Sequence, residues 1–210
     1  MNLAAELARG ITALAMSQPD QAAARKLIDY LRLLEKWNRV YNLTAVREPE
    51  KMLTHHLLDS VAVVPYIDGK TIADVGSGAG LPGIPLAIMI PNARVTLIES
   101  NHKRCGFIRQ AIIELELTNT DVQQARVETF RPTVLFDNVI SRAFADLGEF
   151  ISLAHHVCSP HGSLIAMKGL HPYEEINNMP AGFVVNRVVP LSVPGVDGAR
   201  HLVFIKTAES

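Results

Sequence analysis

The first 64 residues carry apolar side chains at steps of three and four, which is the spacing of one face of a helix. One such stripe lies in residues 21–37 and comprises Leu27, Tyr30, Leu31, Leu34 and Trp37. Another lies in residues 51–64 and comprises Met52, Leu53, Leu57, Leu58, Val61 and Val64. The segment Ser17-Gln18-Pro19-Asp20 supplies a cap and a start before the first stripe, and Asp68-Gly69 supplies a turn after the second. The pattern predicts a helical N-terminal extension over residues 1–68.

From Thr71 onward, short apolar runs alternate with segments of helical spacing. The runs predict strands at 71–75, 94–99, 121–124, 136–140, 163–168, 183–190 and 201–206. The segments between them predict helices at 82–90, 102–117, 146–158 and 172–178. The middle strands suit a parallel sheet covered on both faces, whereas the last two are joined by a Pro- and Gly-rich loop and suit an antiparallel pair at an edge. We therefore expect an α/β fold with a mostly parallel twisted sheet, compact over residues 69–210.

Composition and charge narrow the class of protein. The 210 residues include 20 basic and 21 acidic side chains, so the net charge of -1 argues against a protein that grips naked duplex by overall charge. Cys105 and Cys158 are too few and too far apart for a disulfide framework or a zinc site. The sequence has no apolar run of 18 residues and no signal-peptide pattern near its start. We expect a cytoplasmic protein that does not associate with membranes.

A glycine-rich segment follows the first predicted strand and reads Asp74-Val75-Gly76-Ser77-Gly78-Ala79-Gly80-Leu81. Glycine suits such a turn because a Cβ would block both positive φ and the approach of a ligand to the backbone. Glu99 lies 19 residues beyond Gly80, at the end of the next strand, where a carboxylate can accept hydrogen bonds from two ribose hydroxyls. No Gly-Lys-Ser/Thr follows, so a P-loop is excluded. The segment predicts a site for a nucleotide-like ligand.

The spacing G-x-G-x-G after an acid differs from the usual dinucleotide pattern G-x-G-x-x-G. It resembles the S-adenosylmethionine loop of Rossmann-like class I methyltransferases, whose last strand also runs antiparallel. That resemblance implies that the loop at Asp74, Gly76, Gly78 and Gly80 faces the methionine end of the cofactor, and that Glu99 holds the ribose. The alternative is a tight turn without a ligand, beside an exposed strand end at Glu99.

Further segments extend the resemblance over nearly the whole chain. They are Lys36-Trp37-Asn38, Tyr41-Asn42-Leu43-Thr44, His56-Leu57-Leu58-Asp59-Ser60, Leu81-Pro82-Gly83-Ile84-Pro85, Arg126-Val127-Glu128, residues 136–145 ending in Ser141-Arg142-Ala143-Phe144-Ala145, Met167-Lys168-Gly169 and residues 197–203. Together they resemble the bacterial small-subunit ribosomal RNA guanine-N7 methyltransferases (the RsmG, formerly GidB, family). The resemblance implies S-adenosylmethionine as methyl donor and N7 of one guanine in 16S ribosomal RNA as acceptor. It also implies cofactor contacts at Gly76, Leu81, Val127, Glu128 and Arg142. Some members carry Asp in place of Glu99.

The chemistry of guanine N7 agrees with the residue types present. N7 has an exposed lone pair and no proton, so in-line displacement needs orientation and electrostatic stabilisation but no general base and no covalent enzyme intermediate. Neither cysteine has the proline-flanked setting of a cytosine-C5 nucleophile, and residues 141–144 lack the Asp/Asn-Pro-Pro-aromatic motif of adenine-N6 enzymes. The His55-His56 and His155-His156 pairs point in different directions on a helix, so we expect no metal site.

Several residues are candidates for direct contact with RNA or cofactor. Arg142 ends the fourth strand and can bond the cofactor carboxylate or guanine O6, or form a surface salt bridge. Phe144 can stack on the target base or pack in the core, and Lys168 can contact phosphate or remain solvated. Further candidates are basic residues after Glu99 and before the last strand, namely Lys103, Arg104, Arg109 and Arg200.

N7 of guanine lies in the deep, narrow major groove of A-form RNA, where side chains reach poorly. We therefore expect the target to be a loop or an unfinished ribosomal particle and not a plain duplex. We expect 16S ribosomal RNA to be bound within a 30S particle or an assembly intermediate, and the enzyme to act as a monomer. Two alternatives remain at this point. One is a methyltransferase acting on another RNA or a small molecule, and the other is a non-catalytic nucleotide-binding factor for ribosome assembly.

Overall fold

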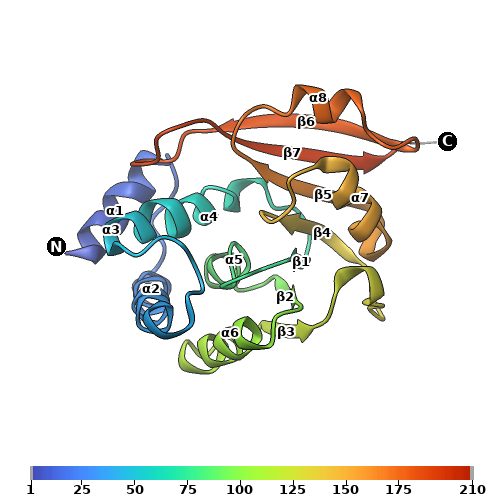
Figure 1. Cartoon of the computed structure of the whole chain (residues 1–210). Coiled ribbons are helices and arrows are strands. Elements are labelled where there is room, and N and C mark those ends of the chain that lie inside the picture. Colours follow the sequence, from blue (N-terminus) through green and yellow to red (C-terminus); the bar gives the residue numbers. More distant parts are fainter. Residues whose placement is uncertain (1, 209–210) are drawn as a thin grey trace.

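A seven-stranded sheet in the order β3-β2-β1-β4-β5-β7-β6 crosses the molecule in a computed structural model that describes residues 2–208 (Figure 1). Its strands are β1 (Thr71–Val75), β2 (Arg94–Glu99), β3 (Thr120–Gln124), β4 (Phe136–Ser141), β5 (Cys158–Lys168), β6 (Phe183–Leu191) and β7 (Arg200–Thr207). Strands β1 to β5 pair in parallel, and β7 runs antiparallel to both β5 and β6. The expected mostly parallel sheet with an antiparallel last strand is confirmed.

The strand order reverses between β1 and β4: β2 and β3 follow on the β1 side of the sheet, whereas β5, β7 and β6 lie on the β4 side. In open α/β sheets, ligands bind outside the carboxyl ends of the strands at such a switch point. Along β1, Ile72 packs into one apolar cluster, while Ala73 and Val75 pack into the cluster on the opposite face. Both faces are therefore covered, which explains why the middle strands read as continuous apolar runs.

Helices cover the two faces. Helices α5 (Gly83–Met89) and α6 (His102–Glu114) contribute to the first cluster, and α7 (Leu147–Ala154) contributes to the second. The short helix α8 (Tyr173–Asn177) follows β5, and single 3-10 turns form η3 (Val127–Thr129) and η4 (His155–Val157). None of the helices within residues 2–208 has the length and apolar character needed to cross a membrane.

The N-terminal extension is helical, as expected. It contains α1 (Leu3–Ala13) and α2 (Gln21–Tyr41), and Asp20 caps α2 by accepting a hydrogen bond from the backbone N–H of Ala23 at 2.7 Å. Leucines of α1 and α2 belong to the same apolar cluster as the inner strands. The extension and the sheet therefore share one core, while the division at residue 68 stays a prediction.

The segment expected as one helix at 51–64 is helical over that length but changes type along it. It consists of α3 (Pro49–Met52), a π-helix η1 (Leu53–Leu58), α4 (Asp59–Val61) and a 3-10 turn η2 (Val64–Tyr66). The carbonyl oxygens of His55 and His56 accept hydrogen bonds from Arg142 Nη1 (3.1 Å) and Ser60 Oγ (2.6 Å), respectively. Side chains thus bond two carbonyls of the π-helix, an irregularity that often accompanies functional sites.

Three of the expected element boundaries after residue 70 differ from the observed ones by three residues or more. The helix expected at 102–117 ends at Glu114, because Glu116 takes a left-handed conformation (φ 49°) that ends the helix. The helix expected at 146–158 ends at Ala154, and β5 begins at Cys158 instead of residue 163. The first helix, α1, had no specific sequence prediction beyond the helical character of the N-terminal region.

Candidate functional site

The glycine loop turns sharply from β1 into α5. Gly76, Gly78 and Gly80 all have positive φ (67°, 59° and 84°). A Cβ on Gly80 would lie 2.6 Å from Ile84 Cγ1, so packing alone requires glycine there. A Cβ on Gly78 would instead meet only the Gly76 carbonyl oxygen, at 4.0 Å. The space above Gly78 is thus open, and a ligand can approach the backbone at this point.

Glu99 joins the end of β2 to this loop. Its side chain is 5 % exposed, its Oε2 accepts a hydrogen bond from the Gly78 N–H at 2.9 Å, and its Oε1 accepts one from the Asn101 N–H at 2.8 Å. Arg104 Nη1 lies 3.8 Å from Oε2. The alternative of an exposed strand end is therefore wrong for Glu99. The carboxylate is held beside the glycine loop, where it can accept a further bond from a ligand hydroxyl through its remaining lone pairs.

Asp74 lies beneath the loop. It is fully buried, and its Oδ2 accepts a hydrogen bond from the Gly83 N–H at 2.8 Å, at the start of α5. Oδ1 has no hydrogen-bond partner within residues 2–208. Burial raises the pKa of this carboxyl to about 7, although the Gly83 bond and Arg142 act in the other direction. Asp74 thus holds the loop against α5 from inside.

Tyr30, which was predicted only as part of an apolar stripe, supports the loop from the N-terminal extension. Its hydroxyl donates a 2.7 Å hydrogen bond to the carbonyl oxygen of Ala79, in the glycine loop. The side chain is fully buried, and burial raises the pKa of the hydroxyl above its usual value. A buried tyrosine needs a partner for its hydroxyl, and this need was the available signal that Tyr30 does more than fill the core.

Val127 and Glu128, which the family resemblance implied as cofactor contacts, form the 3-10 turn η3 after β3. The backbone N–H of Ala125, just before this turn, donates to the carbonyl oxygen of Glu99 at 3.2 Å. Val127 is buried, whereas Glu128 is partly exposed, and its Oε1 lies 3.6 Å from Arg126 Nη1. The structure therefore brings this turn to the same edge of the sheet as Glu99.

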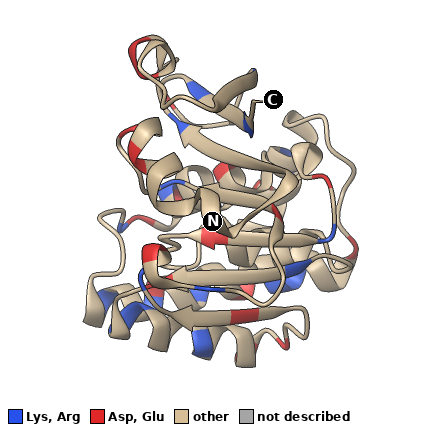
Figure 2. Ribbon diagram, turned by 90° about the vertical axis from the view of Figure 1, so that its right-hand side faces the viewer, with Lys and Arg blue, Asp and Glu red and all other residues tan. Residues whose placement is uncertain are grey.

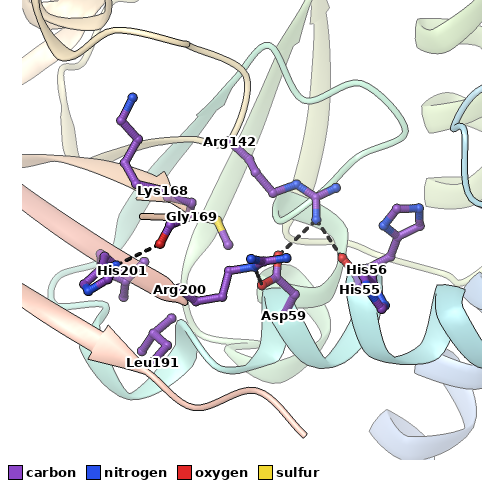
Figure 3. Close-up of a pocket in the computed structure, with 11 residues that line it drawn as sticks. His55, His56, Asp59, Arg142, Lys168, Gly169, Leu191, Arg200 and His201 are labelled. Atoms are coloured by element: carbon purple, nitrogen blue, oxygen red, sulfur yellow. Dashed lines mark hydrogen bonds and ion pairs between the residues drawn. The ribbon is translucent and has the colours of Figure 1, made fainter. Parts of the chain in front are cut away.

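A pocket lies at the carboxyl ends of β4 and β5. Its volume is about 420 Å³, and its lining consists of His55, His56, Asp59, Arg142, Met167, Lys168, Gly169, Leu191, Arg200, His201 and Leu202 (Figure 3). Asp59 Oδ2 lies 3.2 Å from Arg142 Nη1, and Asp59 Oδ1 lies 3.2 Å from Arg200 Nε. One buried carboxylate therefore connects two arginines, although Asp59 was not among the predicted site residues.

The histidines of this cavity differ in environment. His56 Nε2 lies 2.8 Å from Thr44 Oγ1, while its Nδ1 is buried without a hydrogen-bond partner in the described part of the chain. Burial, assisted by Arg142, lowers the pKa of His56 to about 4, so the ring is neutral near pH 7. Within residues 2–208 no group of three His, Cys, Asp or Glu side chains could hold a metal ion.

Lys168 and Phe144, two of the candidate contact residues, already interact with neighbouring residues. Lys168 Nζ lies 2.7 Å from Glu175 Oε2 and donates to the Ala145 carbonyl oxygen at 2.6 Å, and its side chain points away from Asp59 (Figure 3). Phe144 stacks on Phe150 with a centroid separation of 5.2 Å. Lys168 is therefore not simply solvated, and Phe144 packs against the core helix α7.

The basic residues after Glu99 lie on the surface. Lys103, Arg104 and Arg109 are exposed on α6, whose first turn is capped by Asn101. Figure 2 shows basic and acidic residues mixed over the ribbon, with basic ones frequent on the helices at the lower end of the view. Arg200 differs from these three because it lies in the cavity, bonded to Asp59.

A glycine loop at the switch point, facing an acid at the end of β2, is the arrangement of a Rossmann-like nucleotide-binding fold. Solved structures agree on the fold. A SAM-dependent methyltransferase from Aquifex aeolicus matches with a TM-score of 0.55 and 20% identity, over 75% of this chain and 93% of that one. The glycopeptide N-methyltransferase MtfA, complexed with S-adenosyl-L-homocysteine, matches with a TM-score of 0.62 and 10% identity, over 73% and 87%.

Sequence comparison identifies the family. The profile described as "rRNA small subunit methyltransferase G" (GidB) matches residues 23–203. A ribosomal RNA small subunit methyltransferase G from Nitrosospira multiformis is 52% identical over 99% of both chains. One of the same name from Laribacter hongkongensis is 50% identical, over 97% of this chain and 98% of its own. The chain belongs to the ribosomal RNA small subunit methyltransferase G family.

Proposed function

We propose that the protein transfers a methyl group from S-adenosylmethionine to N7 of one guanine in 16S ribosomal RNA. Membership of the family supports the reaction class, because relatives about half identical over nearly their full length are named ribosomal RNA small subunit methyltransferases. The observation that carries the assignment of the site is the pairing of the Gly78 N–H with the buried Glu99 carboxylate, next to open space above the loop.

The residues of the loop fit this cofactor. Gly78 lets the methionine end approach the backbone, Gly76 and Gly80 give the loop its shape and belong to the proposed set of contacts, and Glu99 receives the ribose hydroxyls. Leu81, Val127 and Glu128 complete the proposed set of contacts, and Asp74 keeps the loop in place through Gly83. When bound, S-adenosylmethionine supplies a methyl group on a sulfonium, which a lone pair can accept by in-line displacement.

The protein's own part is to bind and orient, because guanine N7 carries no proton that must be removed. In this proposal, Arg142 donates to guanine O6 or to the cofactor carboxylate and stabilises the shifting charge. A covalent enzyme intermediate is not required, and the thiols are poorly suited to one. Burial raises the pKa of Cys105 and raises that of Cys158 to about 11. Cys158 also begins β5, so it lies at the amino ends of the parallel strands, whereas the site lies at their carboxyl ends.

For the RNA, we propose contacts from the exposed basic residues of α6, Lys103, Arg104 and Arg109, and from Arg200 in the cavity. Phe144 and Lys168 stay candidates, although their contacts with Phe150 and Glu175 would have to give way first. We further propose that the enzyme works in the cytoplasm as a monomer on a loop of 16S RNA, within a 30S particle or an assembly intermediate.

Mass mapping of ribosomal RNA from a deletion strain tests the function. One N7-methylguanosine should disappear, return with the wild-type gene and stay absent with Glu99→Ala. Retention of every N7-methylguanosine in the deletion strain would contradict the proposal. It would favour a different substrate or a non-catalytic assembly factor.

Methyl incorporation into naked 16S RNA, 30S particles and a synthetic duplex tests the form of the substrate. We expect the duplex to be the poorest acceptor, because its N7 atoms lie in the deep groove. Equal rates on all three would show that RNA shape does not select the target. Light scattering after size-exclusion chromatography tests the monomer.

A further inference from the structure

The carboxylate of Asp59 joins two arginines that are far apart in the sequence. Arg142 follows β4 and is 83 residues away, and Arg200 begins β7 and is 141 residues away. We propose that Asp59 is a positioning residue, which holds Arg142 and Arg200 side by side so that their free N–H groups receive an unpaired guanine nucleotide in the adjoining cavity. The inference rests on the proposed function, since it assigns the place where the target nucleotide binds.

The cavity lies next to the loop that we assign to the cofactor. Strand β4 pairs with β1, and the Ser141 hydroxyl donates to the carbonyl oxygen of Val75 at 2.7 Å. A Cβ on Gly76 would lie 2.9 Å from Ala143 Cβ, so the residue after Arg142 touches the glycine loop. A base bound by Arg142 is therefore within a short reach of a methyl donor on that loop.

The charges of the cavity suit an anionic nucleotide. Asp59 is the one carboxylate among the lining residues and offsets one of the two guanidinium groups. Lys168 is offset by Glu175, which lies outside the lining. Arg142 and Arg200 thus leave one formal positive charge facing the cavity. A guanidinium matches both a phosphate and the O6/N7 edge of guanine, because its donors form a rigid planar fork.

Each guanidinium has donors left over. Arg142 bonds Asp59 and the His55 carbonyl oxygen through Nη1 alone, and Arg200 uses Nε and Nη1. The Nη2 groups of both arginines make no hydrogen bond within residues 2–208, and both side chains are 28 % exposed. In Figure 3 the two guanidinium groups lie on either side of the Asp59 carboxylate. Two like charges can share this small space because a carboxylate lies between them.

Asp59 itself is 4 % exposed, so it cannot meet an RNA phosphate and acts through the arginines. It directly follows the π-helix η1, whose His55 carbonyl oxygen also accepts from Arg142. Two acceptors, one in the π-helix and one just after it, therefore hold Arg142 Nη1. This degree of fixation is what a site needs to hold a reacting base in line with a methyl donor.

The test compares Asp59→Asn with Glu35→Gln, which removes the same charge from an exposed ion pair with Arg39 on α2. Asp59→Asn should lower kcat/KM on the RNA substrate about tenfold or more, and should leave S-adenosylmethionine affinity by calorimetry within about twofold. Its binding to an unrelated RNA duplex should be as tight as that of wild type or tighter, because the substitution removes one negative charge from a chain of net charge -1. Glu35→Gln should match wild type in kcat/KM.

A double variant keeps the inference testable if Asp59→Asn is less stable. If Asp59 acts through Arg200, then Asp59→Asn combined with Arg200→Gln should be no worse in kcat/KM than the poorer single variant. Additive losses would overturn the inference, as would equal losses of cofactor affinity and turnover in Asp59→Asn. A wild-type protein that methylates no RNA refutes the proposed function and the inference with it. Active wild type with an unaffected Asp59→Asn refutes the inference alone.

Discussion

The backbone N–H of Gly78 donates a hydrogen bond to the carboxylate of Glu99, with 2.9 Å between N and Oε2. The bond joins the glycine loop after β1 to the end of the neighbouring strand β2. Because Glu99 also accepts a bond from the Asn101 N–H, the loop and the acid hold each other in a fixed arrangement beside the open space above Gly78. A site ordered in advance loses less conformational entropy when its ligand binds.

Glu99→Gln should weaken S-adenosylmethionine binding about tenfold to a hundredfold, because hydrogen bonds to a charged acceptor contribute about 1.5–3 kcal/mol. Isothermal calorimetry measures the change. Glu114→Gln, at the exposed end of the same helix that follows Glu99, serves as the control. Unchanged affinity in Glu99→Gln would show that the ribose does not bind this carboxylate.

Gly78→Val should abolish binding of S-adenosylmethionine by filling the space above the loop. Gly182→Val is a matched control, since Gly182 also has positive φ (85°) and no atom within 4 Å of its added Cβ. Both substitutions should cost about 1–3 kcal/mol in stability from backbone strain, so thermal unfolding should not distinguish them. Calorimetry should distinguish them sharply. Normal binding by Gly78→Val would mean that the ligand lies elsewhere.

Arg142→Ala should reduce turnover much more than stability, because Asp59 keeps its second partner Arg200. We expect kcat/KM to fall at least about tenfold and the unfolding free energy to fall by no more than about 1–2 kcal/mol. Steady-state methyl transfer and urea denaturation give the two numbers. A larger effect on unfolding than on transfer would make Arg142 chiefly a structural ion pair. The cofactor dissociation constant of the same variant tells whether Arg142 serves the donor or the base.

Tyr30→Phe should destabilise the fold by about 1 kcal/mol, since it leaves the buried Ala79 carbonyl oxygen without its donor. Because Ala79 belongs to the glycine loop, S-adenosylmethionine affinity should fall as well. Tyr173→Phe is a suitable control, as Tyr173 is exposed on α8. Affinity that is unchanged in Tyr30→Phe would show that the loop keeps its shape without support from α2.

Asp74 gives stability a defined pH dependence. Its folded-state pKa of about 7 lies above the usual 3.8, so the folded protein keeps this proton to higher pH than the unfolded chain does. The contribution of Asp74 to the free energy of unfolding is complete below about pH 4. It declines as pH rises toward 7 and is lost above pH 7. The difference in unfolding free energy between wild type and Asp74→Asn should follow this course in urea titrations from pH 4 to 8. A difference that is constant across that range would contradict a neutral Asp74.

The fold was predictable because its signals are local. Strand β1 was expected at 71–75 and is found there, and the position of Glu99 beside the loop follows from the pairing of β2 with β1. Contacts between distant segments carry no such signal. The Asp59 bond to Arg200 spans 141 residues, and Asp59 reads in sequence as one more polar position on an apolar stripe. The partners of Lys168 and Phe144 likewise depended on how α7 and α8 pack.

Because residues 53–58 form the π-helix η1, the number of residues in this segment is as important for the orientation of the cavity side chains as their identity. Each residue of a helix turns the chain by roughly 100°, so deleting one residue from this turn would rotate His55 and the residues before it by that angle relative to Asp59. The apolar face before the turn or the carboxylate after it would then lose its partners. Relatives that keep every side chain of the cavity but differ by one residue in this turn should therefore require compensating changes nearby.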